Sequence, residues 1–60
     1  MRVYLKFKNS KIYKKAASIL TLIEKNDQDN SIIIDAYDRW SAGQIILPIS
    51  NSLVTYKIYE

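Results

Sequence analysis

The sequence has 60 residues and contains no cysteine, no histidine, and only one glycine and one proline. Without cysteine or histidine the chain cannot form a disulfide, a thiol nucleophile, a Ser-His-Asp triad or the usual zinc ligand sets. A single glycine also excludes a glycine-rich loop that cradles phosphate groups. The sequence therefore predicts a protein that is not an enzyme, takes no small-molecule substrate, and holds no cofactor and no metal ion.

Long hydrophobic runs are missing as well. No apolar stretch approaches the roughly 18 residues that a membrane-spanning helix needs. The start of the chain alternates polar and apolar residues, which is unlike a signal peptide. The lack of cysteine agrees with a reducing compartment. We therefore expect a cytoplasmic protein, of a cell or of an infected host, that does not contact a membrane.

The length allows a single domain over residues 1–60, because so short a chain has room for one core. Its 48% hydrophobic and 25% charged residues are ordinary for a globular protein. A domain of this size buries only about 60% of the surface that its unfolded chain exposes, and neither disulfides nor metals are available to stabilise it. We therefore expect marginal stability, and a homodimer that buries additional surface.

The first half of the sequence predicts one strand followed by one helix. Residues 2–8 alternate, with every second residue from Val3 to Phe7 apolar, as in a half-buried strand. Asn9 and Ser10 are residue types that cap helices. The polar stretch 26–30 is expected to end the helix. The apolar stripe of this helix consists of Ile12, Ala16, Ile19, Leu20 and Ile23.

The second half predicts three strands, over residues 31–37, 44–49 and 53–60. In the middle one, Ile45, Leu47 and Ile49 would share one side. The order β-α-β-β-β indicates an α+β fold, with one four-stranded, mostly antiparallel sheet and a single helix packed on one face. The last strand is the one expected at a free edge of the sheet.

A single helix leaves the other face of the sheet open. Positive charge concentrates in the first part of the chain, because residues 1–25 carry seven cations and one anion, whereas residues 26–60 carry two cations and five anions. The residues expected on the open face are Arg2, Tyr4, Lys6, Lys8, Ile33, Asp35, Tyr37, Gln44, Ile46, Pro48, Thr55, Lys57 and Tyr59.

Tyrosines interleaved with basic residues are typical of surfaces that stack bases and hold phosphates. Three lysines also lie at the start of the predicted helix, where an anion would meet free backbone amides. The candidate residues for binding nucleic acid or another anion are Arg2, Tyr4, Lys6, Lys8, Lys11, Lys14, Lys15, Lys57 and Tyr59.

The stretch Tyr37-Asp38-Arg39-Trp40 is the candidate protein-binding site. Tyrosine, arginine and tryptophan are the side chains that dominate the binding energy of protein interfaces, and Trp40 is the only tryptophan. The alternative is that Trp40 folds back to cap the core, or that Arg39 lies over an aromatic ring.

These features favour a small protein-interaction module, an inhibitor or regulator of a larger protein whose identity the sequence does not reveal. Its size is similar to that of proteins with which viruses and mobile elements block a host enzyme or defence system, although this is an analogy. Two alternatives remain open. One is sequence-tolerant nucleic-acid binding, and the other is a structural homodimer with no further activity.

Overall fold

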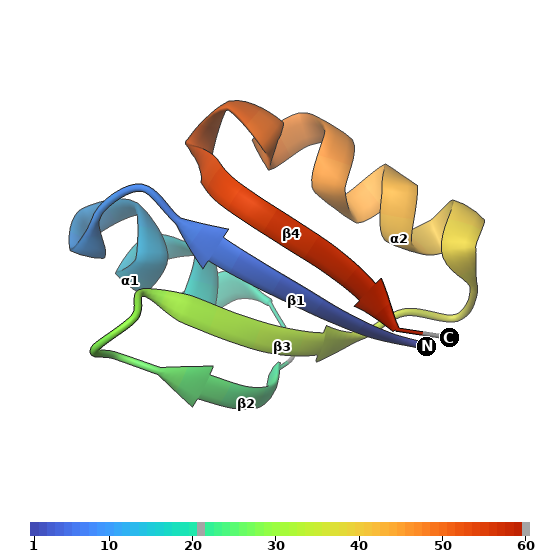
Figure 1. Cartoon of the computed structure of the whole chain (residues 1–60), viewed down its shortest axis with the longest axis horizontal. Helices are drawn as coiled ribbons and strands as arrows, with labels where there is room; N and C mark the ends of the chain where they lie inside the picture. The colour runs from blue at the N-terminus through green and yellow to red at the C-terminus, as the bar shows by residue number, and fades with distance from the viewer. Residues whose placement is uncertain (21, 60) are drawn as a thin grey trace.

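The computed structural model describes residues 1–20 and 22–59, and these residues form a four-stranded antiparallel sheet with two helices (Figure 1). The predicted α+β fold with one four-stranded sheet is confirmed, and the prediction of a single helix is wrong. The elements in chain order are β1 (Arg2–Phe7), α1 (Ser10–Ile19), β2 (Leu22–Asn26), β3 (Ser31–Asp35), α2 (Arg39–Ile46), a 3-10 stretch η1 (Leu47–Ser52) that continues α2, and β4 (Leu53–Tyr59).

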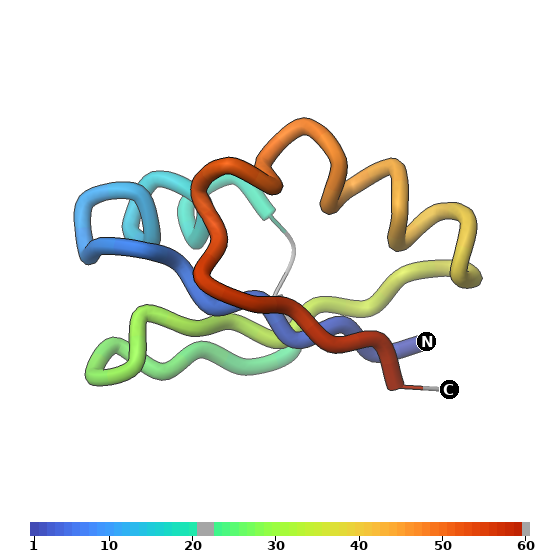
Figure 2. The backbone as a smooth tube through the Cα atoms, turned by 45° about the horizontal axis from the view of Figure 1, so that its top comes forward, coloured from blue at the N-terminus to red at the C-terminus, as the bar shows by residue number. Residues whose placement is uncertain are grey.

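The strands lie in the order β2-β3-β1-β4, and each neighbouring pair is antiparallel. The connections from β1 to β2 and from β3 to β4 each pass through a helix and skip one strand. Both helices lie on the same side of the sheet (Figure 2). The β-α-β-β-α-β connectivity is the split β-α-β, or ferredoxin-like, arrangement. It leaves β2 and β4 at the two edges, as expected for the last strand.

The predicted helix ends earlier than expected. It stops at Ile19, because Leu20 has an extended backbone, and the following strand β2 takes up residues that were assigned to the helix. The polar stretch 26–30 forms the last residue of β2 and the turn to β3 instead of a helix end. The Asn26 side chain accepts hydrogen bonds from the amides of Gln28 and Asp29, and Asn30 has a left-handed backbone with φ 55°. Asparagine tolerates both roles well.

The strand predicted over residues 44–49 is also wrong, because these residues belong to α2 and η1. Ala42 and Ile46, four residues apart, are both buried, which is a helical spacing. Leu47, expected on the buried side of a strand, is exposed. Pro48 lies near the start of η1, and because it has no amide hydrogen the α-helical bonding of α2 ends with the bond from the Leu47 amide to the Gly43 carbonyl.

The core lies between the sheet and the two helices. Phe7 and Tyr13 are its largest rings, with centroids 6.5 Å apart and planes tilted by 58°. Tyr13 was not predicted as a core residue, whereas Ile19, which was, is 75% exposed. The buried hydrophobic residues are Val3, Leu5, Phe7, Tyr13, Ala16, Ile32, Ile34, Ala36, Ala42, Ile46 and Leu53.

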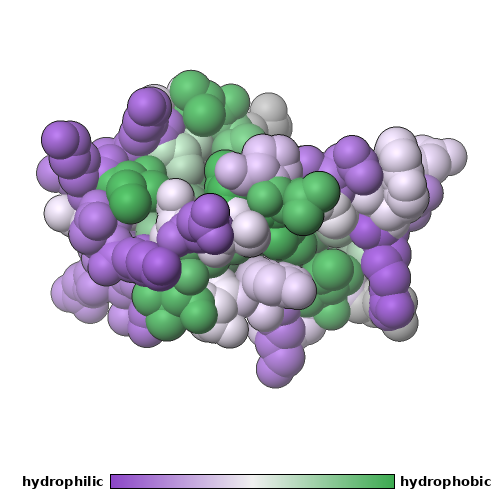
Figure 3. Space-filling model, turned by 90° about the horizontal axis from the view of Figure 1, so that it is seen from above, coloured by the Kyte–Doolittle hydropathy of each residue, from purple (hydrophilic) through white to green (hydrophobic). Residues whose placement is uncertain are grey.

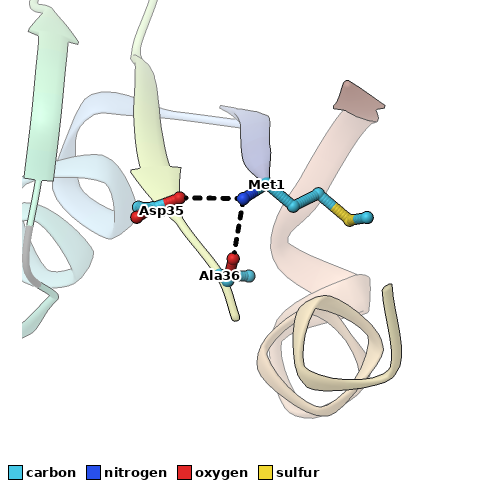
Figure 4. Close-up of polar contacts among 3 residues, drawn as sticks. All are labelled: Met1, Asp35 and Ala36. Carbon is cyan, nitrogen blue, oxygen red and sulfur yellow. Dashed lines mark hydrogen bonds and ion pairs between the residues drawn. The ribbon is translucent and has the colours of Figure 1, made fainter. Parts of the chain in front are cut away.

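The start of β1 is joined to the end of β3, close to the point where α2 begins. The amino group of Met1 donates hydrogen bonds to a carboxylate oxygen of Asp35, at 3.0 Å, and to the carbonyl oxygen of Ala36, at 2.9 Å (Figure 4). The amide of Ala36 in turn donates to the carbonyl of Met1 at 2.8 Å. These bonds hold the segment that leads into α2 against the sheet.

Candidate protein-contact surface

The four candidate residues from Tyr37 to Trp40 lie between β3 and α2 and include the first turn of that helix. The Tyr37 side chain is 92% exposed and the Trp40 side chain is 73% exposed. Trp40 therefore does not cap the core. Arg39 is exposed as well. Both large aromatic side chains are exposed, and the segment that carries them lies at the end of the molecule where β1 starts and β4 ends (Figure 1).

Asp38 has a structural role in this cluster. Its side chain accepts a hydrogen bond from the Ser41 amide at 2.8 Å, and its backbone is extended, so Asp38 is the N-cap of α2. A second bond, from the Ala42 amide to the Asp38 carbonyl at 2.9 Å, closes the first turn. Because the backbone is fixed on both sides of it, Trp40 is held on an ordered helix rather than on a mobile loop.

The surface continues along α2 and across to β4. Trp40, Gly43 and Leu47 are spaced by three and four residues and so share one face of the helix. Leu47 is 71% exposed, and Val54 and Tyr56 of β4 are exposed too. Figure 3 shows this side of the molecule, with apolar side chains across its middle and hydrophilic ones toward both ends.

A groove of about 260 Å³ runs between α2 with η1 on one side and β4 on the other. Glycine in a helix interior costs about 1 kcal/mol relative to alanine, so a glycine in this wall is unexpected on propensity alone. The alternating pattern of residues 44–49 predicted a strand, and a strand there would form no such groove, so the groove was not predicted from the sequence. The residues that line it are Gly43, Ile46, Leu47, Ser50, Tyr56 and Ile58.

The open face of the sheet lies on the side away from the helices. The alternation of β1 and β4 predicted this face correctly, and the register places Arg2 beside Tyr59 and Tyr4 beside Lys57. The Lys57 ammonium lies 5.7 Å from the centre of the Tyr59 ring. Gln44, Ile46 and Pro48, which were expected here, lie in the helical layer instead.

The basic candidate residues fall into two groups. Arg2, Tyr4, Lys6, Lys57 and Tyr59 belong to β1 and β4 and share the open face. Lys11, Lys14 and Lys15 are exposed on α1, in the helical layer on the other side of the sheet, and Lys8 follows the end of β1. At the start of α1 the Asn9 side chain already accepts a bond from the Ile12 amide, at 2.9 Å. A single bound molecule cannot cover both groups without wrapping around an edge.

The side chain of Tyr13 has a raised pKa. Its hydroxyl donates a hydrogen bond of 2.5 Å to a carboxylate oxygen of Asp27, in the turn between β2 and β3. This bond, together with the removal of the phenol from water and the nearby negative charge, raises the pKa of Tyr13 to about 12 from 10.0. The bond ties α1 to the β2–β3 turn, which is a structural role.

The Tyr13–Asp27 bond predicts an alkaline loss of stability. Because the folded-state pKa lies above the unfolded value of 10.0, the protonated phenol stabilises the fold below pH 10, and this contribution is lost as the pH rises through about 12. Urea unfolding across this window should show a steeper loss of unfolding free energy in the natural chain than in Tyr13→Phe. Equal slopes in the two proteins would contradict the assignment.

Nothing in the described residues suggests a metal centre or a membrane span. Residues 1–20 and 22–59 contain no group of three or more acidic side chains placed to hold a metal ion. Among the same residues, no helix has the length and apolar character to cross a bilayer. Comparison with protein-family models, with curated proteins and with solved structures finds no match to this chain.

Proposed function

We propose that the chain is a non-enzymatic protein-interaction module that binds a larger protein through Tyr37, Arg39 and Trp40 and so inhibits or regulates it. The observation that carries this proposal is the exposure of Trp40, at 73%, on a capped helix beside an almost fully exposed Tyr37. Burying large exposed aromatic side chains against a partner lowers the free energy and so favours binding.

The fixed backbone conformation of residues 37–40 also favours binding. A side chain on a fixed helical turn loses less conformational entropy on binding than one on a flexible loop, so more of the contact energy appears as affinity. Tyrosine and tryptophan add large contact areas with only two side-chain torsions each. The cluster therefore has the chemistry of an interface anchor, and a pocket on the partner would accept the Trp40 indole.

Capture of partners with the immobilised chain, in parallel with variants, tests the proposal. The partner should be retained by the natural chain and lost from Trp40→Ala. Ile19→Ala is the matched control, because Ile19 is similarly exposed, at 75%, but lies at the end of α1. A set of captured proteins that is the same for all three chains would rule out Trp40 as the anchor.

The open face of the sheet supports a second candidate function, the binding of single-stranded nucleic acid. There, basic and aromatic side chains alternate across neighbouring strands, with Arg2 beside Tyr59 and Tyr4 beside Lys57. Such a surface can stack bases on tyrosine rings while its cations meet phosphates. Asp35 and Glu24 belong to neighbouring strands and weaken this attraction.

Salt dependence separates this candidate from protein binding. Three phosphate contacts, by Arg2, Lys6 and Lys57, would lower the affinity for a single-stranded oligonucleotide by about 20-fold between 50 and 200 mM salt. Fluorescence anisotropy should show this decrease, and Lys57→Ala should weaken binding while Lys14→Ala on α1 should not. The absence of binding at low salt, or equal losses in both variants, would end this candidate.

A further inference from the structure

The two edges of the sheet differ in how open they are to a further strand. The edge strand β2 is five residues long, has an irregular register between Leu22 and Glu24, and carries Glu24 and Lys25. Short length, bulges and charged residues are the usual features that keep an edge strand from pairing with a strand of another molecule. The edge strand β4 is seven residues long, its irregularity is confined to its start at Val54, and Lys57 is its one charged residue.

Gly43 gives an independent observation at the same place. It lies inside α2 and lines the groove beside β4. Apart from its chain neighbours and the backbone of its own helix, no atom of the described residues comes within 4 Å of a β-carbon built on it. Its backbone is not left-handed, so neither conformation nor packing within the chain requires glycine there. Glycine is among the least favourable residues in a helix interior. What the missing side chain does is widen the groove.

We propose that β4 pairs with β4 of a second copy of this chain, and that the groove above Gly43 receives a side chain of that copy. In the antiparallel pairing centred on Tyr56, all seven residues of β4 take part, and Tyr56 meets the second Tyr56. Lys57 then lies opposite Thr55 of the other copy, so that no like charges face each other.

Other registers of the two strands fit less well. A shift by one residue would place the helical layers of the two copies on opposite sides of the joined sheet. Centring the pair on Lys57 would oppose two lysines, which is unfavourable. Tyr56 and Ile58 point to the helical side, because their partners on β1, Leu5 and Val3, are buried there. The groove of about 260 Å³ has room for an aromatic ring, since an apolar cavity of about 150 Å³ already holds benzene.

The available area agrees with a weak, specific dimer. The principal extents are 27 × 21 × 18 Å, and the side seen in Figure 3 lies within a rectangle of the longest and the shortest of these, about 490 Å². Specific interfaces need about 500 Å² from each partner, so the strand edge, the groove and the exposed face of α2 must all contribute.

The pairing goes beyond the proposed function and does not depend on it. Because the paired strands run antiparallel, the starts of the two α2 helices lie at opposite ends of the interface. The dimer would therefore carry two Tyr37–Trp40 clusters facing apart. A partner with two binding sites would then be held more tightly than by one copy.

Sedimentation of the purified chain alone tests the dimer, from micromolar concentration to about 0.5 mM. The natural chain should change from monomer to dimer as its concentration rises, with a dissociation constant in the micromolar range. Tyr56→Lys opposes two new cations at the centre of the interface and should weaken the dimer at least tenfold. Gly43→Met fills the groove with a good helix former, and should weaken the dimer similarly without lowering the thermal stability of the monomer.

Ile23→Lys on the opposite edge is the matched control and should leave the dimer unchanged. A natural chain that stays monomeric at the highest concentration would overturn the proposal. So would a dimer that Tyr56→Lys does not weaken, or one that Ile23→Lys weakens as strongly. Because no partner protein is present, any of these failures leaves the proposed binding through Trp40 untouched.

Discussion

Replacing Phe7 by alanine should remove most of the stability of the domain. Phe7 is 2% exposed and its ring lies against Tyr13, at the junction of β1 and α1. Removing a buried phenylalanine side chain lowers the unfolding free energy by about 3–5 kcal/mol. The loss of the transfer free energy of the ring and the cost of the cavity left behind add together. At about 0.05–0.15 kcal/mol per residue, a chain of 60 residues has only about 3–9 kcal/mol in total.

Urea unfolding followed by circular dichroism measures this effect. The control is Val54→Ala, which shortens a side chain that is 60% exposed on β4 and should change the unfolding free energy by less than about 0.5 kcal/mol. A loss below about 1 kcal/mol for Phe7→Ala would mean that the core does not depend on the contact between β1 and α1.

Replacing Trp40 by alanine should abolish partner binding without affecting the fold. A central aromatic anchor contributes about 2 kcal/mol or more to affinity, so the dissociation constant for the captured partner should rise at least about 30-fold. The side chain is exposed and the N-cap bond from Ser41 to Asp38 remains, so the unfolding free energy should change by less than about 0.5 kcal/mol.

Titration of the partner by calorimetry, with unfolding measured on the same samples, separates the two effects. Tyr37→Ala should weaken binding less than Trp40→Ala, because it removes a smaller aromatic surface. An affinity that falls only in proportion to a loss of folded protein would assign Trp40 a structural role instead.

The strands β1, β3 and β4 could be predicted because alternation is a direct consequence of lying on a sheet with one covered face. The same pattern misled in residues 44–49. There, Ile45 and Ile49 are also four residues apart, as are Ala42 and Ile46, so a helix satisfies the apolar positions as well as a strand does. Packing against the rest of the fold decides between the helix and the strand, and the spacing of apolar residues in the sequence does not reveal that packing.

Strand β2 was missed for a related reason. Ile23 follows Ile19 by four residues and so continues the helical stripe of α1 in the sequence, although Ile23 lies on β2 and both side chains are substantially exposed in the folded chain. The polar stretch after Lys25 is equally compatible with a helix end and with a hairpin turn. The Asn26 side-chain bonds to the amides of Gln28 and Asp29 distinguish the two only once the fold is known.

The candidate site was predictable in part. Residue type identified Tyr37 and Trp40, but their exposure depends on where α2 begins, and the Asp38 cap that sets this was not recognised. The groove and the role of Gly43 followed only after residues 44–49 proved helical. Asp38, a residue type that caps helices, placed before Ala42 and Ile46 with their helical spacing of four, was the signal that could have located the helix start.

Quenching of tryptophan fluorescence by acrylamide tests the central claim most directly, because Trp40 is the only tryptophan and reports on the contact surface alone. In the dilute free chain, the quenching constant should approach that of a free tryptophan amide, and it should fall when the partner binds. A chain that is folded by circular dichroism but whose tryptophan is shielded from acrylamide when free would contradict the account.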